Sequence, residues 1–125
     1  MIARVEVVRK SKLRPGRSTP GMKRDSAFES EGLLVARSRI SGGRVSAWHH
    51  HGKREVYGFL VEGSLRIEFG EGGKRYVDLH PGDFFHIPKA LIHRDVNPKR
   101  RKAAVVANFF VGSGDIVVNV DGREQ

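Results

Sequence analysis

The chain contains no cysteine. Disulfide bonds are therefore excluded, and so is any metal site built on thiolates, which leaves nitrogen and oxygen as the available metal ligands. No apolar run approaches the roughly 20 residues that a membrane-spanning helix needs, and the N-terminus lacks the long apolar segment of a signal peptide. We expect a cytoplasmic protein with no membrane association.

Helical periodicity is also missing, and hydrophobic residues make up only 38% of the 125 residues. The 15 glycines indicate many turns. Short apolar runs alternate with these turns from residue 27 onward, a pattern typical of a β-sandwich or closed barrel. We predict strands over residues 2–9, 33–40, 44–51, 55–61, 64–69, 74–79, 83–87, 91–96, 103–111 and 115–120.

The formal net charge of +9 is concentrated in residues 9–14, 23–24 and 99–102. We interpret these stretches as solvated loops, since no nucleic-acid motif accompanies them and charge alone supplies only non-specific affinity. Residues 10–25 contain two Pro-Gly pairs and predict a long basic loop. We therefore divide the chain into an N-terminal strand and basic arm over residues 1–26 and one β domain over residues 27–125.

Three consecutive histidines, His49-His50-His51, precede Glu55 by only a few residues. Side chains alternate between the two faces of a strand, so His49 and His51 share a face with apolar neighbours and are expected to point inward, whereas His50 points outward. In the next predicted strand Glu55, Tyr57 and Phe59 share one face, which we also assign to the interior. Two imidazoles and a carboxylate are costly to bury unless they are paired or bind a metal.

A fourth ligand should come from elsewhere in the chain, and His93 is the candidate. It follows a corner at Pro88-Lys89-Ala90 at the start of a predicted strand. The competing histidines are His80, in a turn, and His86, whose neighbours take the inward positions. A metal site of His49, His51, Glu55 and His93 is the prediction, with a purely structural histidine cluster as its alternative. Phe85 joins Tyr57 and Phe59 as the predicted pocket wall.

The spacing of these residues resembles the two motifs of the cupin superfamily. The first motif is a glycine, five residues, His-X-His, three or four residues, Glu, six residues and a glycine. Here Gly43, the three histidines and Glu55 fit, but seven residues separate Glu55 from Gly63, and Val56 occupies the alternative position. The second motif is a glycine, five residues, Pro-X-Gly, two residues, His, three residues and Asn. Its positions are matched by Gly82, Pro88, Ala90, His93 and Asn97, with alanine in place of the second glycine.

The resemblance is greatest to small stand-alone single-domain cupins. It implies an all-β, cupin-type jelly-roll barrel, to which this chain would add a loop-rich basic N-terminal arm. It also implies one divalent metal ion (Fe, Mn, Ni, Cu or Zn) on the residues matching the motif ligands, a small-molecule ligand, and frequently a homodimer. It implies no single reaction, because fold does not determine function.

Three functions remain open from the sequence. The first is a metal-dependent enzyme of isomerase, dioxygenase or lyase type that acts on a small polar or anionic metabolite. The second is a non-catalytic cupin that binds a sugar or sugar acid. The third is nucleic-acid association through the basic loops, for which charge is the sole support.

Overall fold

A computed structural model describes residues 2–121 as two antiparallel β-sheets that pack face to face. The elements are the 3-10 helices η1 (Lys10–Lys12) and η2 (Glu71–Gly73) and the strands β1 (Arg14–Pro15), β2 (Lys23–Ser30), β3 (Leu33–Ile40), β4 (His49–His50), β5 (Glu55–Glu62), β6 (Leu65–Phe69), β7 (Arg75–Leu79), β8 (Phe84–Ile87), β9 (His93–Val96), β10 (Ala104–Val111) and β11 (Val118–Asn119).

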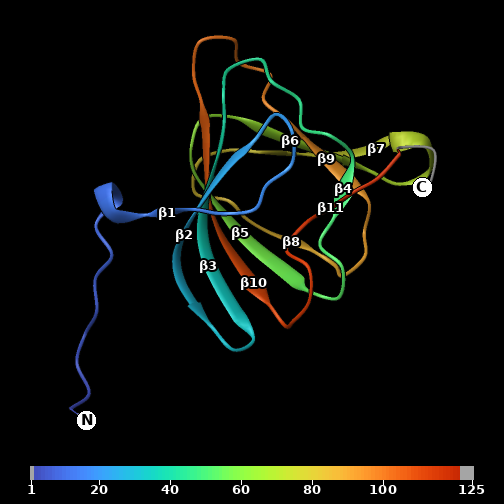
Figure 1. Cartoon of the computed structure of the whole chain (residues 1–125). Helices are drawn as coiled ribbons and strands as arrows, with labels where there is room; N and C mark the ends of the chain where they lie inside the picture. The colour runs from blue at the N-terminus through green and yellow to red at the C-terminus, as the bar shows by residue number, and fades with distance from the viewer. Residues whose placement is uncertain (1, 122–125) are drawn as a thin grey trace.

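One sheet has six strands in the order β1-β2-β3-β10-β5-β8, and the other has five in the order β11-β4-β9-β6-β7 (Figure 1). This confirms the all-β class and gives a jelly roll, but the hydrogen-bonded ladders do not close into the single barrel that we expected. Aliphatic side chains and Phe110 fill the space between the sheets and form one core cluster. Within residues 2–121, no helix is long and apolar enough to cross a membrane.

The strands from residue 33 onward form close to where they were predicted, with two exceptions. The strand over 44–51 is reduced to the two residues of β4 and a bridge from Val45 to Val96, and the strand over 115–120 is reduced to the two residues of β11. The N-terminal part differs more. Residues 2–9 form no strand, and the segment predicted as a loop over 10–25 contains η1, β1 and the start of β2. β2 was missed because Lys23–Ser30 is mostly polar and lacks regular alternation, although it pairs along β3.

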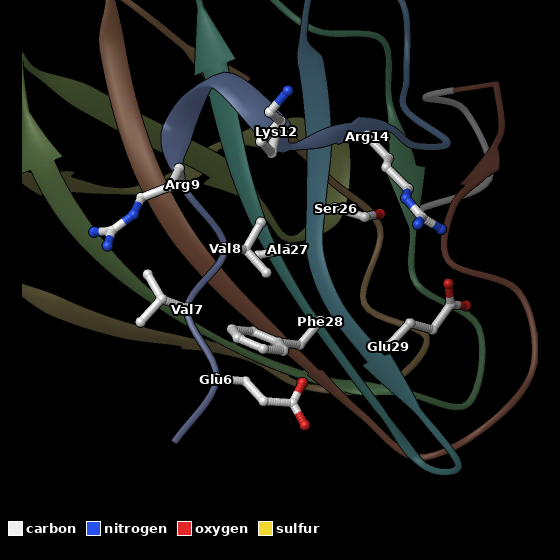
Figure 2. A pocket seen from close by; sticks show the side chains of 10 residues that line it. All are labelled: Glu6, Val7, Val8, Arg9, Lys12, Arg14, Ser26, Ala27, Phe28 and Glu29. Atoms are coloured by element: carbon white, nitrogen blue, oxygen red, sulfur yellow. The ribbon is translucent and has the colours of Figure 1, made fainter. Parts of the chain in front are cut away.

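The N-terminal segment runs away from the two sheets (Figure 1). An open hollow of about 490 Å³ lies between this segment and β2, and Figure 2 shows Val8 of the segment and Phe28 of β2 facing it. Val5 and Val7 are exposed. None of the histidines lines this hollow, so it is separate from the predicted metal site.

Candidate metal centre

Three histidines from distant parts of the chain meet between the sheets. His49 on β4 pairs directly across the sheet with His93 on β9, and His51 follows β4 by one residue. Their ligand nitrogens all lie within 4.8 Å of one another. The three side chains are 0%, 2% and 0% exposed for His49, His51 and His93. They therefore form a compact, solvent-excluded cluster of imidazoles.

Hydrogen bonds to the backbone fix the orientation of each ring. The Nδ1 atoms of His49, His51 and His93 lie 2.8, 2.7 and 2.9 Å from the carbonyl oxygens of Ala47, Ile116 and Leu91. A carbonyl can only accept, so each Nδ1 carries the proton and each Nε2 is left with a lone pair. His49 Nε2 and His93 Nε2 are buried without a hydrogen-bond partner among the described residues. Such tethered rings are the arrangement of metal-binding histidines, whose second nitrogen is held by the protein.

The environment keeps these rings neutral. Burial, followed by the neighbouring His93 and His51, lowers the pKa of His49 to about 2. Burial and then His93 lower the pKa of His51 to about 3. Burial also lowers the pKa of His93. All three are therefore in the neutral form that binds metal across the physiological pH range.

The corner that leads into β9 is held by the backbone. Ala90 stands where the cupin motif has glycine and adopts φ +60°, in the left-handed region. Its N–H donates to Gly52 O at 2.8 Å, which ties the corner to the loop that follows His51. An alanine in this conformation is strained by roughly 1 kcal/mol relative to glycine. The corner keeps its shape in spite of the substitution.

His51 and His93 line a small cavity of about 20 Å³ together with two buried charged side chains. Arg24 on β2 is 3% exposed and Asp95 on β9 is 5% exposed. The Arg24 guanidinium donates to Ser38 Oγ at 3.1 Å and Arg17 O at 3.2 Å. It also lies 4.8 Å from the centroid of the Phe110 ring. Burial lowers the pKa of Arg24 to about 10, while Asp95 opposes the shift, so the side chain remains cationic.

Glu55 is not brought to the three histidines. β5 buries Val56 and Leu60 and turns Glu55 and Tyr57 to the outer face of the six-stranded sheet, the reverse of the predicted orientation. There Glu55 Oε1 lies 2.6 Å from His86 Nε2, and Glu55 Oε2 accepts from Lys89 N at 3.3 Å. The hydrogen bond with His86 is the main cause that lowers the pKa of Glu55.

The three predicted pocket residues divide between the two faces of this sheet. Phe85 lines the cavity, where its ring occupies the space left by Gly58. Tyr57 is 47% exposed and stacks on His86 with ring centroids 4.7 Å apart. Phe59 packs against Phe84 on the same outer face. The assignment of Tyr57 and Phe59 to the interior is therefore wrong.

Sequence reasoning missed Arg24 and Asp95. Arg24 lies in a segment that was assigned to a loop, so its inward direction had no strand parity to reveal it. Asp95 is two residues after His93, and strand alternation predicts that both point to the same face. The sequence therefore carries a signal for the inward direction of Asp95.

The sequence profile described as "Cupin domain" matches residues 36–109, a span that includes all three histidines. A curated relative, germin-like protein subfamily 2 member 3 of Arabidopsis thaliana, is 31% identical over 80 residues. The match covers 62% of this chain and 36% of that relative, so the chain spans about a third of the relative's length.

Solved structures share the fold at low sequence identity. The polyketide cyclase RemF from Streptomyces resistomycificus is similar with a TM-score of 0.76 and 15% identity, over 94% of this chain and 87% of that one. Oxalate decarboxylase from Bacillus subtilis is similar with a TM-score of 0.71 and 21% identity, over 88% of this chain and 30% of that one. At such identities the likeness extends to the fold and not to the reaction.

Proposed function

The chain belongs to the cupin family, and on that premise we propose that it binds one divalent metal ion through His49, His51 and His93. The observation that carries the proposal is the tethering of all three Nδ1 atoms to backbone carbonyls, which leaves the Nε2 lone pairs in a buried cluster. A purely structural cluster would be expected to pair those nitrogens, because an unpaired buried acceptor costs roughly 1–3 kcal/mol.

The nitrogen-rich ligand set suits Fe, Mn, Ni, Cu or Zn. When bound, such an ion supplies Lewis acidity toward a carbonyl or carboxylate, or activates water or dioxygen. The protein's own contribution is to keep the imidazoles neutral, to orient each ring with its Nε2 atom toward the cluster, and to exclude bulk water from the site. Phe85 adds an apolar wall on the side of β8.

The position of Arg24 supports the proposal that the ligand is a small anion. Its guanidinium is buried in the cavity that His51 and His93 line, and a guanidinium is well suited to carboxylate recognition. A metal ion and Arg24 together would place two positive groups around one small space, which favours an anion there. The cavity of about 20 Å³ holds a water-sized group, so a larger ligand requires Phe85 or Met22 to move.

We propose a metal-dependent enzyme of isomerase, dioxygenase or lyase type that acts on a small polar or anionic metabolite. The alternative is a non-catalytic cupin that binds a sugar or sugar acid. It is favoured by the lining of the cavity, where the described residues offer no carboxyl or imidazole group other than Asp95, His51 and His93 as a general acid or base. A metabolite screen with product formation as readout separates the two: turnover with any of the metals supports the enzyme, and binding without turnover under all of them supports the alternative.

Metal titration of the purified protein tests the metal centre. The metal-free protein should bind one equivalent of Zn²⁺, and His49→Ala and His93→Ala should lose it. His50→Ala is the matched control, since His50 lies next to the cluster but its Nδ1 accepts from Gly52 N. Equal metal binding in all four proteins would contradict the proposal.

We also propose that two copies associate through the outer face of the six-stranded sheet. A row of apolar and aromatic side chains that ends at the polar His86 crosses five strands on that face through the paired residues Phe28, Val35, Phe109, Tyr57 and His86. Phe28, Phe109 and Tyr57 are exposed, and contiguous apolar patches of this kind mark interaction sites. The neighbouring N-terminal segment adds the exposed Val7 (Figure 2).

Sedimentation equilibrium tests the dimer. The wild-type protein should sediment as a dimer at micromolar concentration, and Phe109→Glu should convert it to a monomer. Tyr76→Glu is the control, because Tyr76 is an exposed aromatic residue on the other sheet. A monomeric wild-type protein, or a dimer that Phe109→Glu leaves intact, would refute this interface.

A further inference from the structure

A hollow outside the metal cavity lies where β2 begins and β3 ends. Its volume is about 380 Å³, and it is lined by Gly21, Met22, Lys23, Arg39, Ser41 and Arg44. Sites for small molecules have volumes of roughly 300–1,000 Å³, so a small metabolite fits this space. Three of the lining residues are cationic and none carries a carboxylate. The composition of the lining therefore favours an anion.

The pairing of β2 with β3 places two of these cations side by side. Lys23 lies directly opposite Arg39, and both are exposed on the outer face, whereas the neighbouring Arg24 is buried. Like charges directly opposite each other destabilise a sheet. The next outward pair on the same strands has opposite charges, and its Asp25 Oδ2 lies 3.6 Å from Arg37 Nη2. Positive charge thus remains at Lys23 and Arg39, while the adjacent pair is neutralised.

The third cation, Arg44, is carried by a braced turn. Its N–H donates to Ser41 O at 3.1 Å, and its carbonyl accepts from Asn97 N at 2.9 Å. The Asn97 side chain is buried and also donates to Ser41 O, at 3.3 Å. Gly43 N donates to Lys99 O at 2.9 Å, which brings the basic stretch that starts at Lys99 against the turn. Two basic stretches that are distant in the sequence therefore meet beside this hollow.

The protein itself does not neutralise the three cations. Among residues 2–121, no hydrogen bond or ion pair involves the side chain of Lys23, Arg39 or Arg44. A phosphate monoester carries nearly two negative charges at neutral pH and three strong acceptor oxygens. Guanidinium groups recognise phosphate through paired hydrogen bonds, and the hydroxyl of Ser41 adds a further donor. The donors that line the hollow match this group.

We propose that the hollow binds the phosphate group of a small phosphorylated metabolite. Nucleic acid is the competing anion, but no aromatic side chain lines the hollow to stack on a base. The hollow neighbours the metal cavity, since Met22 lines both, but none of the three histidines lines it. The proposal therefore holds whether or not the metal centre does.

Calorimetric titration of the metal-free protein with glycerol 2-phosphate tests the site, because no metal is then present to bind the phosphate. The wild-type protein should bind one equivalent, and glycerol should not bind. Arg39→Gln and Arg44→Gln should each weaken binding roughly fivefold, the upper range for one exposed ion pair. Arg75→Gln is the matched control, since it removes the same charge from an exposed position on the other sheet, and it should retain the wild-type affinity.

Three results would overturn the proposal. The first is the absence of binding at millimolar glycerol 2-phosphate. The second is an equal loss of affinity in Arg39→Gln and Arg75→Gln, which would mean that net charge alone attracts the anion. The third is tighter binding of a single-stranded oligonucleotide that the same two variants weaken, which would assign the hollow to nucleic acid.

Nuclear magnetic resonance gives a check without any variant. Glycerol 2-phosphate should shift the backbone amide signals of Gly21, Ser41 and Arg44, because these residues line the hollow. Shifts confined to residues elsewhere in the protein would place the phosphate at another site and contradict the proposal.

Discussion

Acid should destabilise the metal-free protein, and the size of the effect follows from the buried histidines. Their pKa values in the folded state, about 2 for His49 and about 3 for His51, lie far below the ordinary value of 6.5. As the pH falls through 6.5, the unfolded chain takes up protons at these positions and the folded protein does not. The unfolded state then binds more protons, so the free energy of unfolding decreases.

The magnitude can be worked out for these two residues. At about pH 5.5, one unit below the unfolded-state pKa, each lowers the free energy of unfolding by roughly 1.4 kcal/mol, so together they lower it by roughly 3 kcal/mol. His93 adds to the loss, since burial lowers its pKa too. Asp95 acts in the opposite direction, because burial raises its pKa and the folded state takes up that proton first.

Urea unfolding in the presence of a chelator, at about pH 7.5 and pH 5.5, measures the difference. His51→Asn keeps a donor near Ile116 O and should lose the share of the pH dependence that His51 contributes. His80→Gln should retain the full dependence, because His80 is exposed beside Asp83. Equal stability of the wild-type protein at the two pH values would refute the neutral, buried state of the histidines.

Three further variants test the apolar wall at Phe85, the proposed anion site at Arg24 and the backbone corner at Ala90. Gly58→Ala should destabilise the protein by roughly 1–3 kcal/mol in thermal unfolding, because its new Cβ would lie 2.1 Å from Phe85 Cζ; Phe85→Ala in the same chain should recover part of the loss. Arg24→Met should weaken binding of oxalate to the metal-loaded protein at least tenfold by calorimetry, whereas Arg39→Met, on the exposed side of β3, should not. Ala90→Gly should stabilise the protein by roughly 1 kcal/mol in urea unfolding, and a loss of stability would contradict the strain assigned to its φ of +60°.

The sequence predicted the positions of the strands along the chain better than the faces of the strands. On β5 both sets of alternating residues contain large apolar side chains, so hydrophobicity could not distinguish inside from outside. The structure resolves this with a residue from another strand, since Phe85 of β8 fills the volume at Gly58.

The histidines were identifiable because their spacing is fixed by local geometry. His49 and His51 alternate with His50, and His93 lies at a set distance beyond a corner. Arg24 depends on tertiary structure, because it lies on a strand whose polar sequence predicted a loop. The inward direction of Asp95, in contrast, follows from its alternation with His93. Glu55 has the spacing of the motif glutamate, but the alternation of side chains along β5 places it on the outer face of the sheet.

Anomalous diffraction at the absorption edge of the bound metal, in a crystal of the native protein, tests the metal centre most directly. We expect one strong peak between His49 Nε2, His51 Nε2 and His93 Nε2. A peak at Glu55 and His86, or no peak in a protein saturated with metal, would contradict it.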